Sequence, residues 1–284
     1  MGANQSVHHL AKGRVFKLQR DEQRSEQSFW LFETKPEEKL PVEVDLSPMF
    51  PPVFDQGNLG SCTANAILAS FQYEAKKEKC QDTENLSRLY EYYKARETMI
   101  PPNVKEDTGT SLAMSVYCLY EYGVCDEKYW PYDVTMFNQE PPKEAVENAK
   151  YHKCVEFKKV TQTHEQMRAG LAHGYSFVLG ISVYSSMMTP TVGETGVVPM
   201  PVISDTVIDG KKVKADTLMG GHAVCCVGYN DQTKQYKIRN SWSDKWGDKG
   251  YFYLPYEFVE NNEYTYDMWS IRMVKSQNAP VAGK

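Results

Sequence analysis

The sequence predicts an α+β protein of two lobes, a helical lobe over about residues 40–175 and a β-rich lobe over about residues 176–275. Three observations predict this fold class. Apolar residues recur at three- and four-residue intervals in the first half of the chain, which is the helical period. The second half holds short runs rich in Val, Ile, Tyr and Phe between turn residues, which is typical of strands. The chain has 284 residues, of which 41% are hydrophobic, so it can bury a sizeable core.

The helical half begins after Cys62, where apolar residues share one helix face and the basic stretch 76–79 suits a helix C-terminus. The residues of this face are Ile67, Leu68, Phe71 and Ala75. Further helices are predicted over Asn85–Met99, over Ser111–Tyr122 with Gly123 as its cap, and from the capping box of Thr163 and Gln166 to Gly174.

Five strands are predicted in the second half: Ser176–Tyr184, Ala223–Tyr229, Gln235–Ser241, Tyr251–Tyr256 and Met268–Lys275. Within Val202–Thr217, the pair Asp209-Gly210 is a hairpin-turn signal between two short apolar-basic runs. This stretch is either a small β-flap beside the cleft or a plain surface loop. Substrates tend to bind between lobes, so we expect the functional site there.

Residues 1–39 differ from the rest and form a polar N-terminal extension, a pro-region or a tether, ahead of a compact domain over residues 40–284. The beginning of the chain has no apolar region of the kind that marks a secretory signal peptide, and no stretch is long enough to span a bilayer. We therefore expect an intracellular, cytoplasmic protein. Gly2 fits the N-myristoylation pattern, and nearby basic residues could add weak membrane association.

Composition excludes several classes of function. The net charge is −5 and both signs are mixed along the chain, so we expect no nucleic-acid partner. The seven cysteines include no C-x-x-C pair, and without an export signal they are expected to stay reduced. His8-His9 lies in the polar extension and is not expected to bind metal. We expect no metal, no cofactor, and a monomer as the favoured oligomeric state.

The stretch Gln56-Gly-Asn-Leu-Gly-Ser-Cys62 leads directly into the first predicted helix, where the helix dipole favours a thiolate. Taken alone, Cys62 could equally be a buried apolar residue. Far downstream, His222 opens a predicted strand and Asn240 precedes Ser-Trp242. A nucleophilic cysteine needs a base, and the base needs a third group to orient its ring. A core histidine and a turn asparagine are reasonable readings singly, but the joint occurrence favours catalysis.

These blocks resemble the active-site motifs of papain-like cysteine peptidases: Gln56-Gly-x-x-Gly-Ser-Cys62, Gly221-His-Ala223, and Asn240-Ser-Trp242 with Trp246-Gly247. The similarity extends over roughly residues 40–275. It implies a papain-like two-lobed fold, with a helical left lobe, an antiparallel β right lobe, and the active-site cleft between them.

The resemblance also implies roles for individual residues. Cys62 would be the nucleophile, His222 the acid/base and Asn240 its orienter, while Gln56 would donate to the oxyanion and Trp242 would shield the His222–Asn240 bond. The substrate-binding residues would be Gly60, Ser61, Gly109, Thr110, Leu112, Gly221 and Trp242.

Three positions depart from the familiar pattern. Leu59 stands where a disulfide cysteine is usual, Thr63 replaces an aromatic residue, and Thr110 replaces a second cleft glycine. The first two indicate a prokaryotic or viral branch of the family, and the third puts the contacts to the substrate backbone in doubt. None of the three removes a catalytic group.

The leading functional prediction is an endopeptidase acting on protein or peptide substrates, because no insertion with two histidines follows Pro131-Tyr132. Two alternatives stay open: a catalytically silent peptide-binding homologue and a Cys-dependent acyl transferase. The extension 1–39 is expected to restrain the enzyme, either running in a non-productive direction or lacking a cleavable bond near Cys62. It contains two stretches suited to an extended chain, Arg14-Val-Phe-Lys-Leu18 and Ser28-Phe-Trp-Leu-Phe32. Phe29, Trp30 and Phe32 would cover the cleft or, equally, pack on the outside of a lobe.

Overall fold

A computed structural model describes residues 11, 13–21, 39–80 and 85–276 of the chain. Three sequence-based expectations lie outside the described residues: the acylation of Gly2, the reading of His8-His9, and the placement of the apolar cluster Ser28–Phe32. Within the described residues, no helix is both long and apolar enough to cross a bilayer.

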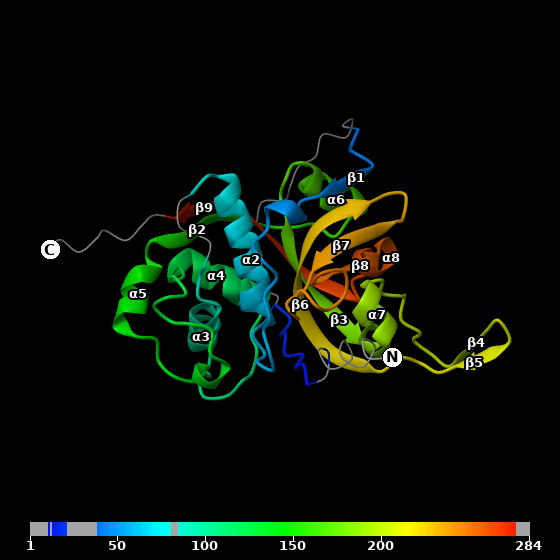
Figure 1. Ribbon diagram of the computed structural model, residues 1–284, viewed down its shortest axis with the longest axis horizontal. Helices are drawn as coiled ribbons and strands as arrows, with labels where there is room; N and C mark the ends of the chain where they lie inside the picture. The colour runs from blue at the N-terminus through cyan, green and yellow to red at the C-terminus, as the bar shows by residue number, and fades with distance from the viewer. Residues whose placement is uncertain (1–10, 12, 22–38, 81–84, 277–284) are drawn as a thin grey trace.

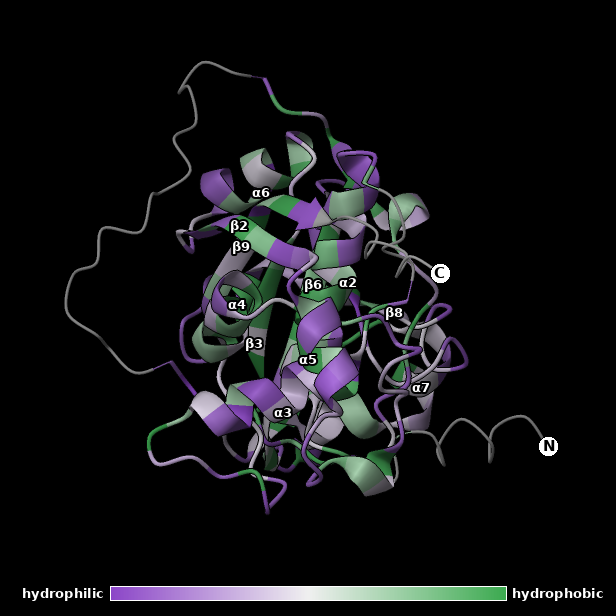
Figure 2. Ribbon diagram, turned by 90° about the vertical axis from the view of Figure 1, so that its left-hand side faces the viewer, coloured by the Kyte–Doolittle hydropathy of each residue, from purple (hydrophilic) through white to green (hydrophobic). Residues whose placement is uncertain are grey.

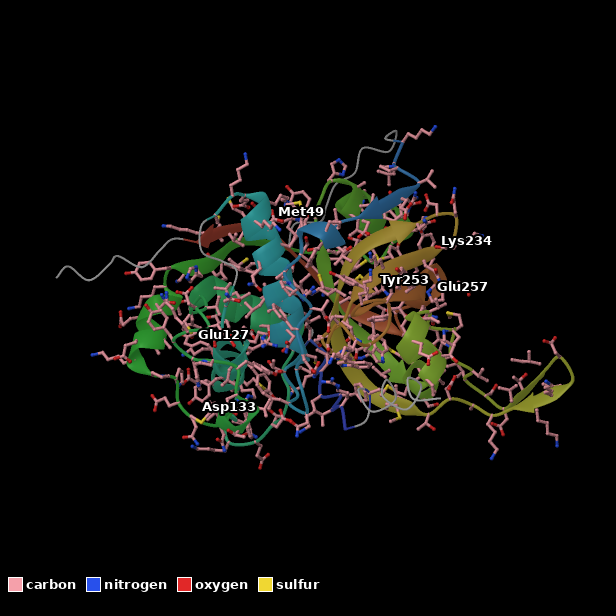
Figure 3. All side chains as sticks on the ribbon, viewed as in Figure 1. Met49, Glu127, Asp133, Lys234, Tyr253 and Glu257 are labelled. Atoms are coloured by element: carbon pink, nitrogen blue, oxygen red, sulfur yellow. The ribbon has the colours of Figure 1, made fainter. Side chains whose placement is uncertain are left out.

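The molecule has two lobes side by side, one mainly helical and one built on an antiparallel sheet, which confirms the predicted fold class (Figure 1). The helical lobe contains α2 (Cys62–Lys77), α3 (Arg88–Thr98), α4 (Leu112–Glu121) and α5 (Lys143–Ala149). The β-rich lobe also carries the helices α6 (His164–Ala172), α7 (Pro190–Thr195) and α8 (Tyr256–Glu260). Exposed charged residues such as Asp133 and Lys234 lie on the outside of the two lobes (Figure 3).

The main sheet has the strand order β2-β9-β3-β6-β7-β8, with β1 paired to β6, and all of its pairings are antiparallel. Its strands are β1 (Glu43–Asp45), β2 (His152–Lys159), β3 (Phe177–Tyr184), β6 (Leu218–Asn230), β7 (Gln235–Arg239), β8 (Tyr251–Pro255) and β9 (Thr265–Ser276). Short 3-10 turns span Ser47–Met49, Val134–Met136 and Ser185–Met188.

Helix α2 lies where the helical lobe meets the sheet, and it contacts both β6 and β9. Its residues from Cys62 to Ala75 are all buried, because the helix packs against these strands and against α3 and α4. The hydrophobic parts of α2, β3 and β6, coloured green, accordingly lie in the middle of the molecule (Figure 2). The first residue of this central helix is Cys62, so the helix fixes the thiol at the boundary between the lobes.

Strand β6 begins at Leu218, which corrects the predicted start at Ala223. The extra residues include Gly220 and Gly221, whose lack of side chains hides the strand pattern in the sequence, although their backbones pair with β3. His222 therefore lies inside the strand, opposite Ile181, rather than at its beginning. The pairing with β3 therefore fixes the His222 backbone within the sheet.

The signal at Asp209-Gly210 does form a hairpin, between β4 (Thr206–Ile208) and β5 (Lys211–Val213). Both turn residues have positive φ, 49° at Asp209 and 76° at Gly210, as a two-residue hairpin turn requires. The hairpin projects away from the β-rich lobe into solvent (Figure 1). It therefore stands apart from α2 and Cys62.

Candidate active site

Cys62 is fully buried at the first turn of α2, with Ser61 as the residue that precedes the helix. Its sulfur accepts a hydrogen bond from the backbone amide of Ala223, the residue that follows His222 in β6. The nucleophile predicted from one lobe therefore touches the strand that carries the predicted base. Residues 160 positions apart in the sequence meet here because α2 packs on β6.

His222 and Asn240 form a hydrogen bond of 2.9 Å between Nε2 and the amide Oδ1. The same Oδ1 accepts from the Ser241 amide at 2.9 Å, which fixes the orientation of the Asn240 side chain. An amide oxygen can only accept, so neutral His222 carries its proton on Nε2. Its Nδ1 is buried and has no hydrogen-bond partner, which leaves that lone pair available as a base.

Aromatic rings enclose the His222–Asn240 pair. The Trp242 ring is stacked on His222 with 5.0 Å between ring centroids, and the Trp246 ring meets Trp242 edge-on at 4.7 Å. Phe16, from the N-terminal extension, approaches both His222 and Trp242, with centroid distances of 6.1 and 5.9 Å. These rings exclude water from the hydrogen bond that orients the histidine.

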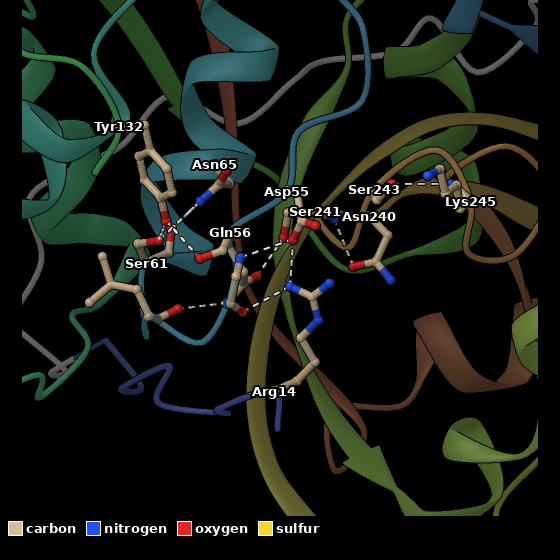
Figure 4. A network of polar contacts seen from close by, with 12 residues as sticks. Arg14, Asp55, Gln56, Ser61, Asn65, Tyr132, Asn240, Ser241, Ser243 and Lys245 are labelled. Carbon is tan, nitrogen blue, oxygen red and sulfur yellow. Dashed lines mark hydrogen bonds and ion pairs between the residues drawn. The ribbon is translucent and has the colours of Figure 1, made fainter. Parts of the chain in front are cut away.

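Gln56 is fully buried in the loop before α2 (Figure 4). Its Oε1 accepts from the Ser241 hydroxyl at 2.6 Å, and its Nε2 donates to the Leu59 carbonyl at 3.0 Å. An amide nitrogen carries two hydrogens, so the second hydrogen of Gln56 Nε2 is available as a donor. Together with the Cys62 backbone N–H it provides two donors of the kind that stabilise an oxyanion.

Burial shifts the pKa values of Cys62 and His222 in the directions that favour their neutral forms. Burial raises the pKa of the Cys62 thiol to about 11, and hydrogen bonds from the Ala223 and Thr63 amides offset only part of that rise. Burial likewise lowers the pKa of His222 to about 4, against the opposing effect of the bond to Asn240. The expectation that the helix dipole yields a thiolate is therefore wrong for this covered state, since loss of water outweighs the dipole.

The remaining predicted residues divide into two groups. Gly60, Gly109, Thr110 and Gly221 contact the N-terminal extension, as described below. The Ser61 hydroxyl instead bonds to Tyr132 at 2.5 Å and to Asn65 at 3.1 Å, within the helical lobe (Figure 4). Ser61 is therefore available to a substrate only through its backbone. Leu112 is buried in the same apolar cluster as Cys62 and Leu18.

Residues 13–21, here called the cleft segment, run between the two lobes and contact both (Figure 1). The Leu18 amide donates to the Gly221 carbonyl of β6, and the Gln19 amide donates to the Thr110 carbonyl beside α4, both at 3.1 Å. The associated pairings, Lys17 with Gly221 and Gln19 with Ser111, are parallel. The segment therefore bridges the two lobes in an extended conformation and places Phe16 against His222.

Side chains hold the cleft segment at both ends. Arg14 is bonded to the Asp55 carboxylate at 2.6 Å and to the Gly57 carbonyl at 2.8 Å (Figure 4). At the other end, the Asp21 carboxylate accepts from the Trp269 indole at 2.7 Å and from the Ala113 amide at 2.8 Å. The stretch Arg14–Leu18, which the sequence marked as suited to an extended chain, thus lies in the cleft.

Several residues of the site were not found from the sequence as functional residues: Ser241, Tyr132, Asp107 and the cleft segment itself. Their partners are distant in sequence, and no local spacing announces the pairing of Ser241 with Gln56 or of Asp107 with Lys17. Only the alternation of basic and apolar residues from Arg14 to Leu18 marked an extended chain. Among the described residues, no group of three His, Cys, Asp or Glu side chains could hold a metal ion.

Comparisons with known proteins agree on one family. The model of the papain family of cysteine proteases matches residues 40–269. An uncharacterized peptidase C1-like protein of Acanthamoeba polyphaga mimivirus is 37% identical over 228 residues, 78% of this chain and 69% of the viral protein. Cysteine proteinase 1 of Entamoeba histolytica is 26% identical over 210 residues, 72% of this chain and 60% of that protein.

Solved structures give the same result. The cysteine protease xylellain from Xylella fastidiosa is 33% identical, with a TM-score of 0.79 over 93% of this chain and 98% of that one. Procathepsin L2 from the larval midgut of Tenebrio molitor, 16% identical, shares the fold with a TM-score of 0.69 over 93% of this chain and 79% of that one. The bacterial and viral relatives also confirm the branch predicted from Leu59 and Thr63. The chain therefore belongs to the papain family of cysteine proteases and is a papain-like cysteine peptidase.

Proposed function

We propose that the protein is an endopeptidase in which Cys62 attacks the scissile carbonyl, with His222 as acid and base, Asn240 as orienter and Gln56 in the oxyanion hole. The observation that carries the proposal is the state of His222. Its Nε2–H is held by Asn240 at 2.9 Å, and its bare Nδ1 is buried beside the strand position that touches Cys62. A core histidine held only for packing would satisfy both ring nitrogens.

The reaction follows from this arrangement. His222 Nδ1 takes the thiol proton, and the sulfur forms a bond to the carbonyl carbon of the substrate. The oxyanion receives hydrogen bonds from the Gln56 amide and the Cys62 N–H, each contributing on the order of 3 kcal/mol. His222 then gives the proton to the departing amine, which leaves a thioester on Cys62. A water molecule, deprotonated by His222, cleaves the thioester to release a carboxylate and restore the thiol.

The direction of the cleft segment supports its role as a restraint. A leaving amine must lie beside His222, so a productive substrate runs from Thr110, on its acyl side, toward Trp242, on its amine side. In the cleft segment the order is reversed. Phe16 lies at Trp242, and Gln19, later in the chain, lies at Thr110. The cleft segment therefore runs past Cys62 in the direction opposite to that of a substrate. In this orientation the extension blocks the cleft without being cleaved.

The same segment supports internal cleavage of substrates. It continues on both sides of His222, from Arg14 at Asp55 to Asp21 at Trp269. A cleft that accepts chain on both sides of the reacting groups can take the middle of a polypeptide. An exopeptidase would instead close one end to hold a chain terminus.

The test uses the full chain and an internally quenched peptide blocked at both ends. Unaltered protein should cleave it in the presence of reductant, whereas Cys62→Ala should not. Cys80→Ala, which removes a half-buried cysteine from the far end of α2, is the matched control and should keep activity. Cleavage by Cys62→Ala would refute the assignment, and cleavage only of peptides with a free terminus would refute the endopeptidase mode. Mass spectrometry with and without an added amine separates hydrolysis from acyl transfer.

A further inference from the structure

A lysine side chain of the protein itself occupies the part of the cleft nearest to the loop of Cys62. The aliphatic part of Lys17 lies over two glycines: a Cβ added to Gly60 would be 3.0 Å from Lys17 Cδ, and one added to Gly109 would be 2.7 Å from Lys17 Cβ. Gly109 also has a φ of +71°, a conformation that side chains disfavour. The two glycines thus leave a slot that one unbranched side chain fills.

The slot ends on Asp107. Lys17 Nζ lies 2.9 Å from the Asp107 Oδ2 and also donates to the Asp107 backbone carbonyl. Only 17% of the Asp107 side chain is exposed, so its charge is screened less by water than that of a surface carboxylate.

Asp107 does not depend on Lys17 for its position. Its carboxylate accepts from the Gly60 amide, with contacts of 3.1 and 3.2 Å, and from the Tyr92 hydroxyl at 2.5 Å. Tyr92 is fully buried in α3, and its hydroxyl in turn accepts from the Gly109 amide at 3.0 Å. The carboxylate is therefore held toward the slot by groups that remain when Lys17 leaves.

The order of contacts along the cleft segment assigns the slot to one substrate residue. Phe16 lies against His222 and Trp242, on the side of the leaving amine. Lys17 is the next residue, and its side chain is the first on the acyl side. Leu18 follows it into an apolar site, where its Cδ2 would be 2.7 Å from a Cβ on Gly180. The slot therefore receives the side chain of the residue whose carbonyl Cys62 attacks.

We propose that Asp107 makes this enzyme prefer a basic residue, lysine above all, immediately before the cleaved bond. The inference rests on the proposed peptidase function and deepens it. One charged group opposes the effect. The Arg96 guanidinium lies 4.1 Å from the centroid of the Tyr92 ring, behind Asp107, and offsets part of the carboxylate charge. We therefore expect a preference of about tenfold in kcat/KM, equal to about 1.4 kcal/mol at 25 °C.

The experiment compares three internally quenched peptides on the full chain, identical except for Lys, norleucine or Glu before the cleaved bond. Norleucine matches the lysine stem without its charge. The measured quantity is the ratio of kcat/KM between peptides, because the fraction of molecules with an open cleft cancels in this ratio. We expect the order Lys, norleucine, Glu, with about tenfold between the first two. Asp107→Asn should bring the Lys/norleucine ratio close to one, whereas Glu106→Gln, which removes the neighbouring exposed charge, should keep it.

Each failure has a separate meaning. Cleavage of all three peptides at similar rates by the unaltered protein overturns the specificity proposal alone, and so does a Lys preference that survives Asp107→Asn. If neither the unaltered protein nor Leu18→Asp, in which the cleft segment is weakened, cleaves any of them, the proposed function fails. The Lys and norleucine peptides are then compared for binding to Cys62→Ala by fluorescence anisotropy. Tighter binding of the Lys peptide, lost in Cys62→Ala/Asp107→Asn, supports the acidic slot, and equal binding overturns it. If Asp107→Asn does not fold, the preference order in the unaltered chain decides.

Discussion

Asn240 determines which nitrogen of His222 carries the proton. Without its amide oxygen, the neutral ring could place the proton on Nδ1 and lose the lone pair that accepts from Cys62. We expect Asn240→Ala to lower kcat/KM by about a hundredfold, a typical size for disturbed acid–base catalysis, and to leave more activity than Cys62→Ala. Asn138→Ala, on the outer part of the helical lobe, serves as control. Loss equal to that of Cys62→Ala would mean that Asn240 does more than orient the ring.

Burial of His222 couples the stability of the site to pH. The pKa of His222 is about 4 in the folded protein and near 6.5 in the unfolded chain. Between these values the unfolded chain binds a proton that the folded protein does not, so the free energy of unfolding falls as pH falls through this window. The full effect is on the order of 3 kcal/mol.

Urea unfolding at pH 7, 5.5 and 4 measures this contribution in Cys62→Ala, in which no thiol titrates beside the ring. The additional change His222→Gln should flatten the slope, whereas His173→Gln, at an exposed position, should not. Identical slopes in all three proteins would contradict a depressed pKa of His222.

At this scale the sequence predicted the candidate catalytic groups and missed most of the groups that hold them. Cys62, His222, Asn240 and Gln56 stand in short motifs that resemble those of papain-like peptidases. Ser241, which fixes the Gln56 amide, is part of a quoted motif, but its role depends on a contact 185 positions away. Asp107 stands in a stretch that resembles the family, but its role was not predicted, because its partners come from three separate segments.

Among the elements, α3 carries a carboxylate where it packs against α4. Glu91 is 1% exposed, and burial raises its pKa to about 8. The folded protein thus keeps a proton on Glu91 that the unfolded chain loses above its ordinary value of 4.5. The stability linked to this group is fully present below pH 4.5 and is lost as pH rises toward 8.

Glu91→Gln should therefore leave the melting temperature nearly unchanged at pH 4.5 and raise it at pH 8, because glutamine has the shape of the protonated acid. Glu97→Gln, at the more exposed end of α3, removes a carboxylate that is paired with Lys94 and should not raise the melting temperature at pH 8. Calorimetry at the two pH values measures both variants. A melting temperature that rises equally at both would indicate a packing effect rather than a titration.

The elements that were predicted have strong periods, and those that were missed are short or polar. Strand β2 contains three lysines and a histidine among eight residues, because it lies at the edge of the sheet and exposes part of its surface. Helices α5, α7 and α8 have seven, six and five residues, which is too few to establish a helical period. In β6, Gly220 and Gly221 have no side chains to show a strand pattern, so the sequence did not predict the first residues of this strand.

At the scale of the whole molecule, the cleft segment ties the two lobes together and covers the reacting groups. Leu18 is its most buried apolar side chain between residues 13 and 21, with 9% exposure. A charge there would have to leave the apolar site or lose its water. We expect Leu18→Asp to raise the initial rate on a small peptide several-fold. Val15→Asp adds the same charge at a half-exposed position and should have little effect.

Unchanged rates for Leu18→Asp, with unchanged melting, would contradict a restraint by this segment. The sequence predicted that residues 1–39 restrain the enzyme, either by a non-productive direction or by the lack of a cleavable bond near Cys62. It marked Arg14–Leu18 only as a stretch suited to an extended chain, because the acidic partners Asp55 and Asp107 are brought to the cleft only by the fold.

The cleft segment is covalently continuous with the peptidase domain, since residues 22–38 join Asp21 to the chain that leads into β1. Its binding is therefore intramolecular, governed by an effective concentration rather than by the concentration of the protein. Dilution cannot release such a segment, however weak its contacts. A single cut in the linker changes the order of the process: the segment becomes a free peptide, and its occupancy falls with protein concentration. After such a cut, the extent of activation would depend on the volume that holds the protein. The released segment would dissociate fully in a large compartment and would rebind in part in a small one.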